Sequence, residues 1–421
     1  MSLELASSLP HGRRFTVNIG TALSMLALTA LSLEPLFGTL AATAFLGSGM
    51  LLIVSQPLHS IGSLLRWWPL LLLPAYCLLS VLWSQFPDST SRYGMQLAFT
   101  LAVAIIIACR VPATTLLRGL FLLYAAGILL CLAIGRSSDG SGAWLGIFSS
   151  KNAFAAFISL FALTSVGLAY DRQSPRWMRI AAVAGALISL PLLIRAQSAG
   201  ALAIIGPCVL TVVLANSLRR LNDMQKAFLI GLGVLLVLAG VLVYAAYGDT
   251  LMAAFLETSG KDSTLTGRTD LWRVGNTLIA ERPLFGVGYR GFWVSGNGPA
   301  EQLWAMFGEP SGAGFSFHNT YITNAVELGY VGLAIEVAII YGAAALLLIL
   351  AFVRPTHVVA VLLGLQVLLI LRSFVEVEVF YEFSSRSMLV YCTFIYAVRD
   401  FQLWRAETRQ QSVINWRLRE A

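Results

Sequence analysis

Charged residues are scarce in this chain. Asp, Glu, Lys and Arg make up 12% of the sequence, against roughly 25% in ordinary soluble domains. Hydrophobic residues make up 57%, and mean hydropathy is +0.77. A soluble fold is excluded, because too few polar side chains remain to cover its surface. Many apolar runs approach the roughly 18–20 residues that cross a bilayer, which predicts an all-α polytopic membrane protein.

Cysteine and histidine are also infrequent. The five cysteines lie in or beside apolar runs without close pairing, a pattern that indicates buried small side chains rather than a disulfide framework or a zinc site. They are Cys77, Cys109, Cys131, Cys208 and Cys392. No DxD-like pair of acids occurs in the largest polar segment. The sequence therefore predicts neither a metal nor a cofactor.

Apolar runs divide the chain into about twelve predicted transmembrane helices within a single integral membrane domain, residues 1–421. The first run follows Arg13 and Arg14 and resembles a signal peptide, but it is interpreted as a retained helix because many further spans follow. The predicted spans are 15–33, 36–54, 67–83, 94–109, 116–134, 152–170, 178–194, 199–215, 227–247, 319–352, 357–371 and 386–400.

The positive charges predict an orientation. The net charge is +7, but in a membrane protein the location of Lys and Arg matters more than their sum. Outside one long segment, most of them fall in short segments on the side of the N-terminus. Both termini are therefore predicted to be cytoplasmic, and no nucleic-acid partner is expected. The long segment, 248–318, becomes a periplasmic loop, and loops of such length are usually functional.

A helix is predicted inside this loop. Thr266 is expected to cap it, Asp270 lies in its first turn, and Pro283 marks its end. Leu271 and its neighbours at helical spacing form an apolar stripe. The sequence predicts an amphipathic helix at the membrane surface, with Arg268 near its start.

The stretch "GVGYRG" that follows spells GxGxxG. Its glycines are Gly286, Gly288 and Gly291. A dinucleotide site would need a preceding strand and a following helix, and neither is expected here. The pattern is interpreted as a tight, irregular turn whose backbone amides face an anion, and Arg290 within it is a candidate substrate-binding residue.

A polar helix start follows in "FSFHNTYITNAVELGYVGL". His318 and Asn319 stand just before the apolar run, and Asn319 is a candidate for substrate binding. Asn324 and Glu327 share a face of the expected helix with Thr320, and such a face must contact protein or water rather than lipid. Glu327 is thus a further substrate-binding candidate. The alternative for His318 is an interfacial residue that only caps the helix.

Other cationic and polar residues lie at predicted outer helix ends. Arg195 occurs in "LIRAQSAGAL", Arg372 in "LLILRSFVEVEVFYEFSSRS", and Lys151 with Asn152 in "GIFSSKNAFAAF". Each alone could be an interfacial anchor. Together they predict a substrate site, because a diphosphate needs more than one cation and guanidinium groups suit phosphate oxygens.

These segments resemble the O-antigen ligase and polymerase family of membrane glycosyltransferases. The matching pieces, in the family's order, are "GIFSSKNAFAAF", "RAQSAGAL", "TGRTDLW", "RPLFGVGYRGF" and "HNTYITNAVELGYVGL". They cover roughly residues 145–335, and the related core is predicted to span 145–352. The "QSAGAL" form is most similar to the exopolysaccharide-polymerase branch.

The resemblance implies glycosyl transfer on the periplasmic face of a bacterial inner membrane. The donor would be an undecaprenyl-diphosphate-linked oligosaccharide and the acceptor a glycan. Arg268, with Arg195, would hold the diphosphate, and His318 would activate the acceptor hydroxyl. Two positions depart from the family pattern: Ala199, where relatives often carry arginine, and Ser150, where many carry histidine. The departure at Ala199 leaves the role of Arg195 open.

Three functions are consistent with these sequence features. A polysaccharide polymerase is the first, and a ligase that moves a finished chain to a lipid or protein acceptor is the second. A flippase for the same lipid-linked sugar is the third; transporters carry charged groups deep in the membrane and broken helices there, and Glu336 is the notable deep charge here. Other polysaccharide assembly and export proteins are further expected partners.

Overall fold

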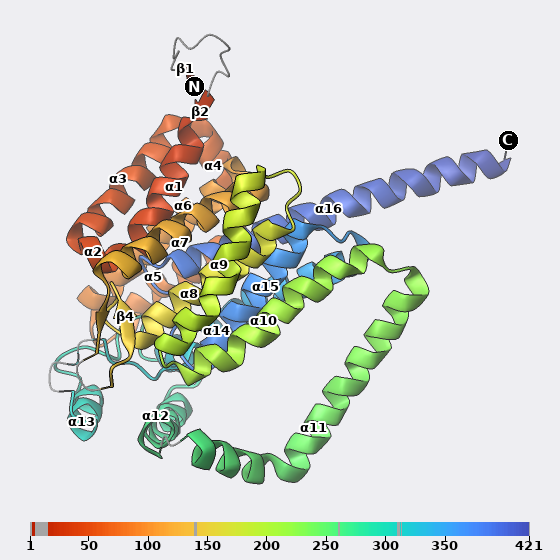
Figure 1. The fold of residues 1–421 in the computed structure, drawn as a ribbon. Coiled ribbons are helices and arrows are strands. Elements are labelled where there is room, and N and C mark those ends of the chain that lie inside the picture. Colours follow the sequence, from red (N-terminus) through yellow and green to blue (C-terminus); the bar gives the residue numbers. More distant parts are fainter. Residues whose placement is uncertain are drawn as a thin grey trace.

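The computed structural model describes residues 2–4, 16–138, 141–259, 262–309, 312 and 314–420, and these are mostly helical (Figure 1). Arg13 and Arg14 lie outside them. Strands occur only as two short antiparallel pairs in this described part, β1 (Ser2–Glu4) with β2 (Thr16–Asn18) and β3 (Arg136–Ser137) with β4 (Trp144–Gly146). The helices are α1 (Ile19–Ser32), α2 (Glu34–Phe37), α3 (Thr39–Ser55), α4 (Pro57–Arg66), η1 (Trp68–Leu71), α5 (Leu72–Leu79), η2 (Ser80–Leu82), α6 (Pro87–Arg110), α7 (Ala113–Ile134), α8 (Lys151–Ala169), α9 (Arg176–Arg195), α10 (Ala199–Ser217), η3 (Leu218–Arg220), α11 (Asp223–Ser259), α12 (Asp262–Glu281), α13 (Gly298–Met306), α14 (Thr320–Val353), α15 (His357–Ser373) and α16 (Ser385–Glu420). The predicted all-α class is confirmed.

Each predicted span coincides with helical structure, but the helices differ in length. Among the described residues, seven helices are long and apolar enough to cross a membrane, or eight if the bent pair α3–α4 is one span. The helices α1 and α15 and the segment Trp68–Leu82 are apolar but shorter. The protein is therefore an integral membrane protein, and the count of twelve crossings and the loop's periplasmic location stay predictions.

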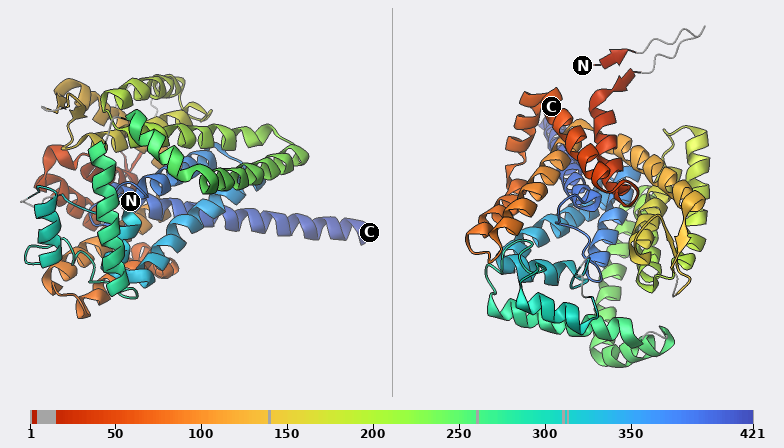
Figure 2. Two further views of the ribbon diagram at one scale, coloured as in Figure 1. Left: turned by 90° about the horizontal axis from the view of Figure 1, so that it is seen from below. Right: turned by 90° about the vertical axis from the view of Figure 1, so that its left-hand side faces the viewer.

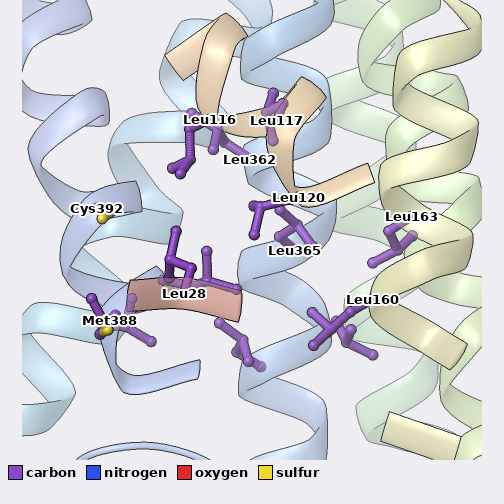
Figure 3. Packing of buried hydrophobic residues seen from close by; sticks show 14 of the residues in the cluster. Leu28, Leu116, Leu117, Leu120, Leu160, Leu163, Leu362, Leu365, Met388 and Cys392 are labelled. Atoms are coloured by element: carbon purple, nitrogen blue, oxygen red, sulfur yellow. The ribbon is translucent and has the colours of Figure 1, made fainter. Parts of the chain in front are cut away.

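The hydrophobic core lies where α1, α7, α8, α15 and α16 meet. Figure 3 shows leucines of α7, α8 and α15 facing one another beside Leu28 of α1 and Met388 of α16. Of these, Leu28, Leu163 and Met388 have no exposed surface. Because α8 is apolar all round and buried on almost every side, it forms the centre of the bundle.

The bend between α3 and α4 has an identifiable cause. The two helices meet at 98° at Pro57, which cannot continue the hydrogen-bond pattern of α3. Arg110, from the end of α6, donates to the carbonyl oxygens of Leu52 and Gln56 at 2.5 and 2.9 Å and to the hydroxyl of Ser60 at 2.6 Å. A half-buried arginine thus satisfies carbonyl groups that the bend leaves free.

Helices α12 and α13 lie at the end of the bundle opposite the two chain termini (Figure 1), and α12 runs across that end (Figure 2). The helix begins at Asp262, so Thr266 lies inside it and the prediction that Thr266 caps it is wrong. The expected apolar stripe exists, but it packs on protein: Leu271 is buried in a second hydrophobic cluster together with Phe317 and Val326. This packing brings Arg268 to the start of α14.

Helix α14 is broken near its beginning. Gly329 has φ 67° and ψ −171°, and a Cβ there would lie 2.3 Å from the backbone of Leu284. The segment 283–288 fills the break, because Pro283 accepts from the amide of Tyr330 at 2.7 Å and Gly288 donates to the carbonyl oxygen of Glu327 at 2.8 Å. The freed backbone groups are therefore satisfied by protein, as a break at membrane depth requires.

The glycines of GxGxxG allow this close approach. Gly286 and Gly288 have positive φ angles of 65° and 102°, a region that glycine adopts without strain. A Cβ on Gly286 would lie 2.5 Å from the backbone of Glu327, and one on Gly288 would lie 2.6 Å from Ser84. The pattern thus forms an irregular turn packed against α14, with no preceding strand.

Candidate functional site

His318 lies at the turn into α14 in a strained conformation. Its φ is 48°, which is uncommon for a residue with a side chain and favours a functional constraint. Asn319 is the residue that caps the helix, because its side-chain oxygen accepts from the amide of Ile322 at 3.0 Å. The alternative in which His318 serves only as the helix cap is therefore wrong.

Three side chains from distant parts of the chain contact the carboxylate of Glu376. His318 Nδ1 lies 2.9 Å from its Oε2, while Arg268 and Asn152 each donate to its Oε1 at 2.7 Å. Ser198, in the "QSAGAL" stretch, donates to the side chain of Asn152 at 3.2 Å. Segments that are far apart in sequence thus meet at one acid beyond the end of α15.

The electrostatics of this group assign the proton on His318. Burial opposes ionisation of Glu376, but the hydrogen bond and charge of His318 and the charges of Arg268 and Arg372 outweigh it, so the pKa of Glu376 lies below its usual value. An ionised carboxylate can only accept hydrogen bonds. Nδ1 of His318 therefore donates across the 2.9 Å contact to Glu376, and in the neutral form of the ring Nε2 is the nitrogen that can act as a base.

A second carboxylate holds two arginines. Arg372 donates to Glu378 Oε1 at 2.7 Å through Nε, and Arg386 Nε lies 3.1 Å from Glu378 Oε2. Thr320 connects this pair to the His318 turn, because its hydroxyl accepts from the amide of Glu378 at 3.0 Å and donates to the carbonyl oxygen of Glu376 at 2.9 Å. Thr320 thus holds the backbone at Glu376 and Glu378 against the start of α14.

Arg290 belongs to a third group of charges. Its guanidinium lies 3.0 Å from Glu382 and stacks over the ring of Tyr93 at 4.9 Å, while its amide donates to Glu327 at 2.8 Å. Burial lowers the pKa of Arg290, but Glu382 and Glu327 outweigh that effect and raise it. Like His318, Arg290 has a positive φ, 55°.

Residues of the first and third groups line one large cavity, hereafter the main cavity. Its volume is about 1050 Å³, large enough for a ligand of several sugar rings. His318, Glu376, Arg290 and Glu327 line it together with aromatic side chains and acids. The lining is formed by Leu31, Glu34, Gly38, Thr39, Ala42, Tyr93, Ser149, Ser150, Asn152, Arg290, Trp293, Glu309, Gly312, Gly314, Phe315, Ser316, His318, Glu327, Glu376, Val377, Tyr381, Glu382 and Phe383. Carboxylates can accept hydrogen bonds from hydroxyl groups of a substrate, and His318 can take a proton there.

The predicted site residues occupy different places. Asn152, Arg290, His318 and Glu327 line the main cavity. Other predicted residues contact this group indirectly: Arg268 binds Glu376, Arg372 is buried on Glu378, and Asn319 donates to the carbonyl oxygen of Phe374 at 3.0 Å. Lys151 is half-buried at the start of α8. Arg195 is exposed at the end of α9 and outside the cavity lining, so the structure does not bring it to the other cations.

Sequence reasoning missed the acids that organise the site. Glu376 and Glu382 are not among the residues that the sequence predicts for the site, although three acids follow Arg372 in "VEVEVFYEF" just after a predicted helix. Acids without lysines at the outer end of an apolar helix are costly unless they have partners. That cost is the signal that would have identified them.

The described residues contain no group of three or more His, Cys, Asp or Glu side chains that could hold a metal ion. All five cysteines are free, and only Cys109 is partly exposed. Histidine, carboxylate and guanidinium groups are among the side chains that line the main cavity.

Comparison with known proteins agrees with this architecture. A family model described as O-antigen ligase matches residues 184–337. The exopolysaccharide production protein ExoQ of Rhizobium meliloti (strain 1021) is 32% identical over 370 residues, which cover 85% of this chain and 83% of the relative. A chain from a peptidoglycan synthase complex has 16% identity and a TM-score of 0.36 over 80% of this chain and 98% of its own, a likeness too loose to carry an argument. From its identity with ExoQ over most of its length, the chain belongs to the O-antigen ligase/ExoQ-like family of membrane proteins.

Proposed function

We propose that this protein is a glycosyltransferase that polymerises undecaprenyl-diphosphate-linked oligosaccharide units into an exopolysaccharide on the periplasmic face of the bacterial inner membrane. The observation that carries the proposal is the His318–Glu376–Arg268 group at a cavity of about 1050 Å³. The relative ExoQ, named for exopolysaccharide production, supports the product class.

The proposed reaction needs one base and one stabilised leaving group. Nε2 of His318 takes the proton of the acceptor hydroxyl as its oxygen attacks the anomeric carbon of the donor sugar. The bond between that carbon and the phosphate oxygen breaks, and its electron pair leaves with the lipid diphosphate. Glu376 orients the ring and stabilises the imidazolium that forms. Nearby guanidinium groups stabilise the charge that develops on the phosphate.

The acceptor in this scheme is a glycan, and the main cavity suits it. Carboxylates of Glu34, Glu309 and Glu382 accept hydrogen bonds from sugar hydroxyls, and the rings of Tyr93 and Trp293 offer faces for sugar rings. A lipid-linked donor carries its own driving force, so the proposal involves no nucleotide or metal. Other assembly and export proteins would receive the polymer.

The direct test is a reaction of purified protein in lipid vesicles with a lipid-linked oligosaccharide of defined length. We expect ladders of longer lipid-linked product with the wild type, and none with His318→Asn at matched protein levels. A ligase would instead transfer the glycan to an added lipid or protein acceptor without lengthening the lipid-linked species. That result would replace the polymerase proposal with the ligase alternative.

A flippase is the second candidate, and the break of α14 at Gly329 with the buried Glu336 beyond it favours it. Glu336 is held by Asn324 at 2.7 Å, however, and the chain's own segment 283–288 fills the break. The same vesicles separate the two functions. Protected lipid-linked sugar that becomes accessible outside, with unchanged length, would support the flippase and contradict the enzyme.

The proposed orientation has its own test. A cysteine introduced at Gln302, which is exposed on α13, should react in intact cells with a thiol reagent that cannot cross the membrane. One introduced at Arg220 should react only after permeabilisation. Cys109→Ser serves as the background, because the other native cysteines are buried. The reverse labelling pattern would place the cavity on the cytoplasmic side and overturn the periplasmic proposal.

A further inference from the structure

A second large cavity, hereafter the N-terminal cavity, lies at the other end of the bundle. It is lined by the start of α1, the end of α3, the start of α4 and the end of α6, which lie at the end that carries the N-terminus (Figure 1). Its volume is about 770 Å³, within the range of roughly 300–1,000 Å³ that small-ligand pockets occupy. It shares no lining residue with the main cavity, so a ligand bound here would be separate from the proposed reaction.

The positive charge in this cavity has no anionic partner. The four hydrogen bonds of the Arg110 guanidinium go to neutral oxygens, two of them backbone carbonyl groups and two the hydroxyls of Ser55 and Ser60. Its Nε is buried without a hydrogen-bond partner, and Arg110 forms no ion pair within the described part of the chain. No acid is among the described residues that line the cavity. A charge that is partly removed from water favours a counter-charge, so an anionic ligand would complete this site.

Helix α4 indicates where the membrane surface lies. It meets α3 at 98°, and three apolar residues at helical spacing, Leu58, Ile61 and Leu65, are 85%, 54% and 68% exposed. The opposite face of the helix buries Ser60 and Ser63. A helix that exposes such an apolar face on a membrane protein lies at the boundary between lipid headgroups and acyl chains. Because the start of α4 also lines the N-terminal cavity, the cavity lies at the depth of the headgroups.

The lining of the N-terminal cavity has a polar part and an apolar part. The exposed side chains of Gln56 and His59 lie in the lining with Arg110. Leu51 and Val54, on the last turns of α3, also line the cavity, yet they are exposed. A phospholipid has the same two parts, a phosphate headgroup and apolar acyl chains. The lining therefore suits a lipid better than a free ion or a sugar.

We propose that the N-terminal cavity binds an anionic membrane phospholipid, with its phosphate at Arg110 and its acyl chains along Leu51 and Val54. Basic pockets between transmembrane helices are suited to anionic headgroups. Gln56 and His59 hydrogen-bond the glycerol of a headgroup such as that of phosphatidylglycerol. The lipid supplies the counter-charge for Arg110 and thereby stabilises the bend between α3 and α4. Because the site is separate from the main cavity, it does not depend on the proposed function.

The test compares Ser55→Asp with Ser55→Asn in the purified full-length protein. Ser55 is exposed and its hydroxyl lies 3.0 Å from Nη1 of Arg110, so aspartate there supplies the missing counter-charge. Asparagine has the same size and leaves Arg110 unpaired. Binding of phosphatidylglycerol and phosphatidylcholine with short acyl chains is measured by native mass spectrometry. We expect the wild type and Ser55→Asn to bind phosphatidylglycerol about tenfold more tightly than phosphatidylcholine, and Ser55→Asp to lose that preference, as for one charge pair near a protein surface.

A second measurement needs no variant. Cys109 lines the N-terminal cavity and is the one partly exposed cysteine among the five. Added phosphatidylglycerol should slow its reaction with a thiol reagent in the purified wild type. Phosphatidylcholine, glycerol phosphate and inorganic phosphate at the same concentration should leave the reaction rate unchanged, because each lacks either the net charge or the acyl chains.

Three outcomes would overturn the inference. Equal preference for phosphatidylglycerol in folded Ser55→Asp and Ser55→Asn would show that the charge of Arg110 holds no headgroup. Equal binding of both lipids by the wild type would show that only acyl chains are held. Equal protection of Cys109 by inorganic phosphate or glycerol phosphate would show that the site takes a free anion. If Ser55→Asp fails to fold, the lipid comparison and the Cys109 reaction in the wild type still decide.

Discussion

Two acids of similar surroundings lie at the two ends of α8. Near its start, Glu376 is bound by Arg268, His318 and Asn152; just beyond its end, Asp171 is bound by Arg118 at 2.7 Å and Ser174 at 2.6 Å, with His357 close by. The helix has 19 residues, so about 28 Å separates the two groups. Both contain an acid, an arginine and a histidine.

Geometry and space distinguish the two groups. His318 is in hydrogen-bond contact with Glu376 at 2.9 Å, whereas Nε2 of His357 lies 3.6 Å from Asp171. The main cavity at Glu376 has about 1050 Å³, but the space at Asp171 has about 10 Å³, room for a single water molecule at most. The same residue types therefore make a site where there is room for a substrate, and a structural clamp where there is none.

The largest expected difference between the two groups is the effect on turnover of replacing their histidines. His318→Asn should lower turnover by roughly 10²–10⁴-fold, the usual worth of a general base, while His357→Asn should leave it near the wild-type rate. Asparagine tolerates the positive φ of position 318, so this variant tests the base without straining the turn as alanine would. Polymer formed per amount of membrane protein is the measurement. An active His318→Asn enzyme would remove His318 from the catalytic group.

A smaller difference is expected for the two acids. Glu376→Gln keeps the shape but no longer requires the proton on Nδ1 of His318, and should lower turnover by roughly 10–100-fold. Asp171→Asn should keep its specific activity and lower the melting temperature instead, because Arg118 and Ser174 lose a charged acceptor. Equal effects of both variants on turnover would contradict the distinction between site and clamp.

The arginine of each group, Arg268 beside Glu376 and Arg118 beside Asp171, allows a further comparison. Arg268→Ala should abolish polymer formation in protein that still reaches the membrane, and Arg268→Lys should restore about a tenth of the activity, because an ammonium group cannot replace a guanidinium fork. Arg118→Lys is the matched control and should be fully active. Full activity of Arg268→Lys would show that only the charge at this position matters.

The smallest expected effect is on stability in acid. Burial raises the pKa of Asp171, but Ser174, Arg118, the amide of Gln173 and His357 outweigh it and leave the pKa below its usual value. A lowered pKa means that this acid stabilises the fold above its unfolded pKa of about 3.9 and loses that contribution as pH falls through its folded pKa. The wild type should therefore melt at lower temperatures below about pH 4, and Asp171→Asn should show a flatter dependence. Identical curves would assign the acid sensitivity to other groups.

Several residues of the candidate site could be identified from the sequence alone. The polar residues at the start of an apolar helix, His318 to Glu327, and the cluster around Arg268 could be identified because such groups are costly near hydrocarbon. Arg195 was grouped with them by the same logic, yet it is exposed at the end of α9. Charge at a helix end indicates only which side of the membrane a residue is on, and not which neighbours it meets.

Composition and apolar run length by themselves determined the helical membrane class and the position of nearly every helix, because each backbone group in hydrocarbon must find its partner within its own segment. The tertiary structure decided the rest. It placed Glu376 between His318, Arg268 and Asn152, packed the segment 283–288 into the break of α14, and opened a cavity at one end of α8 but not at the other. These contacts join residues separated by dozens to hundreds of positions, and no local periodicity encodes them.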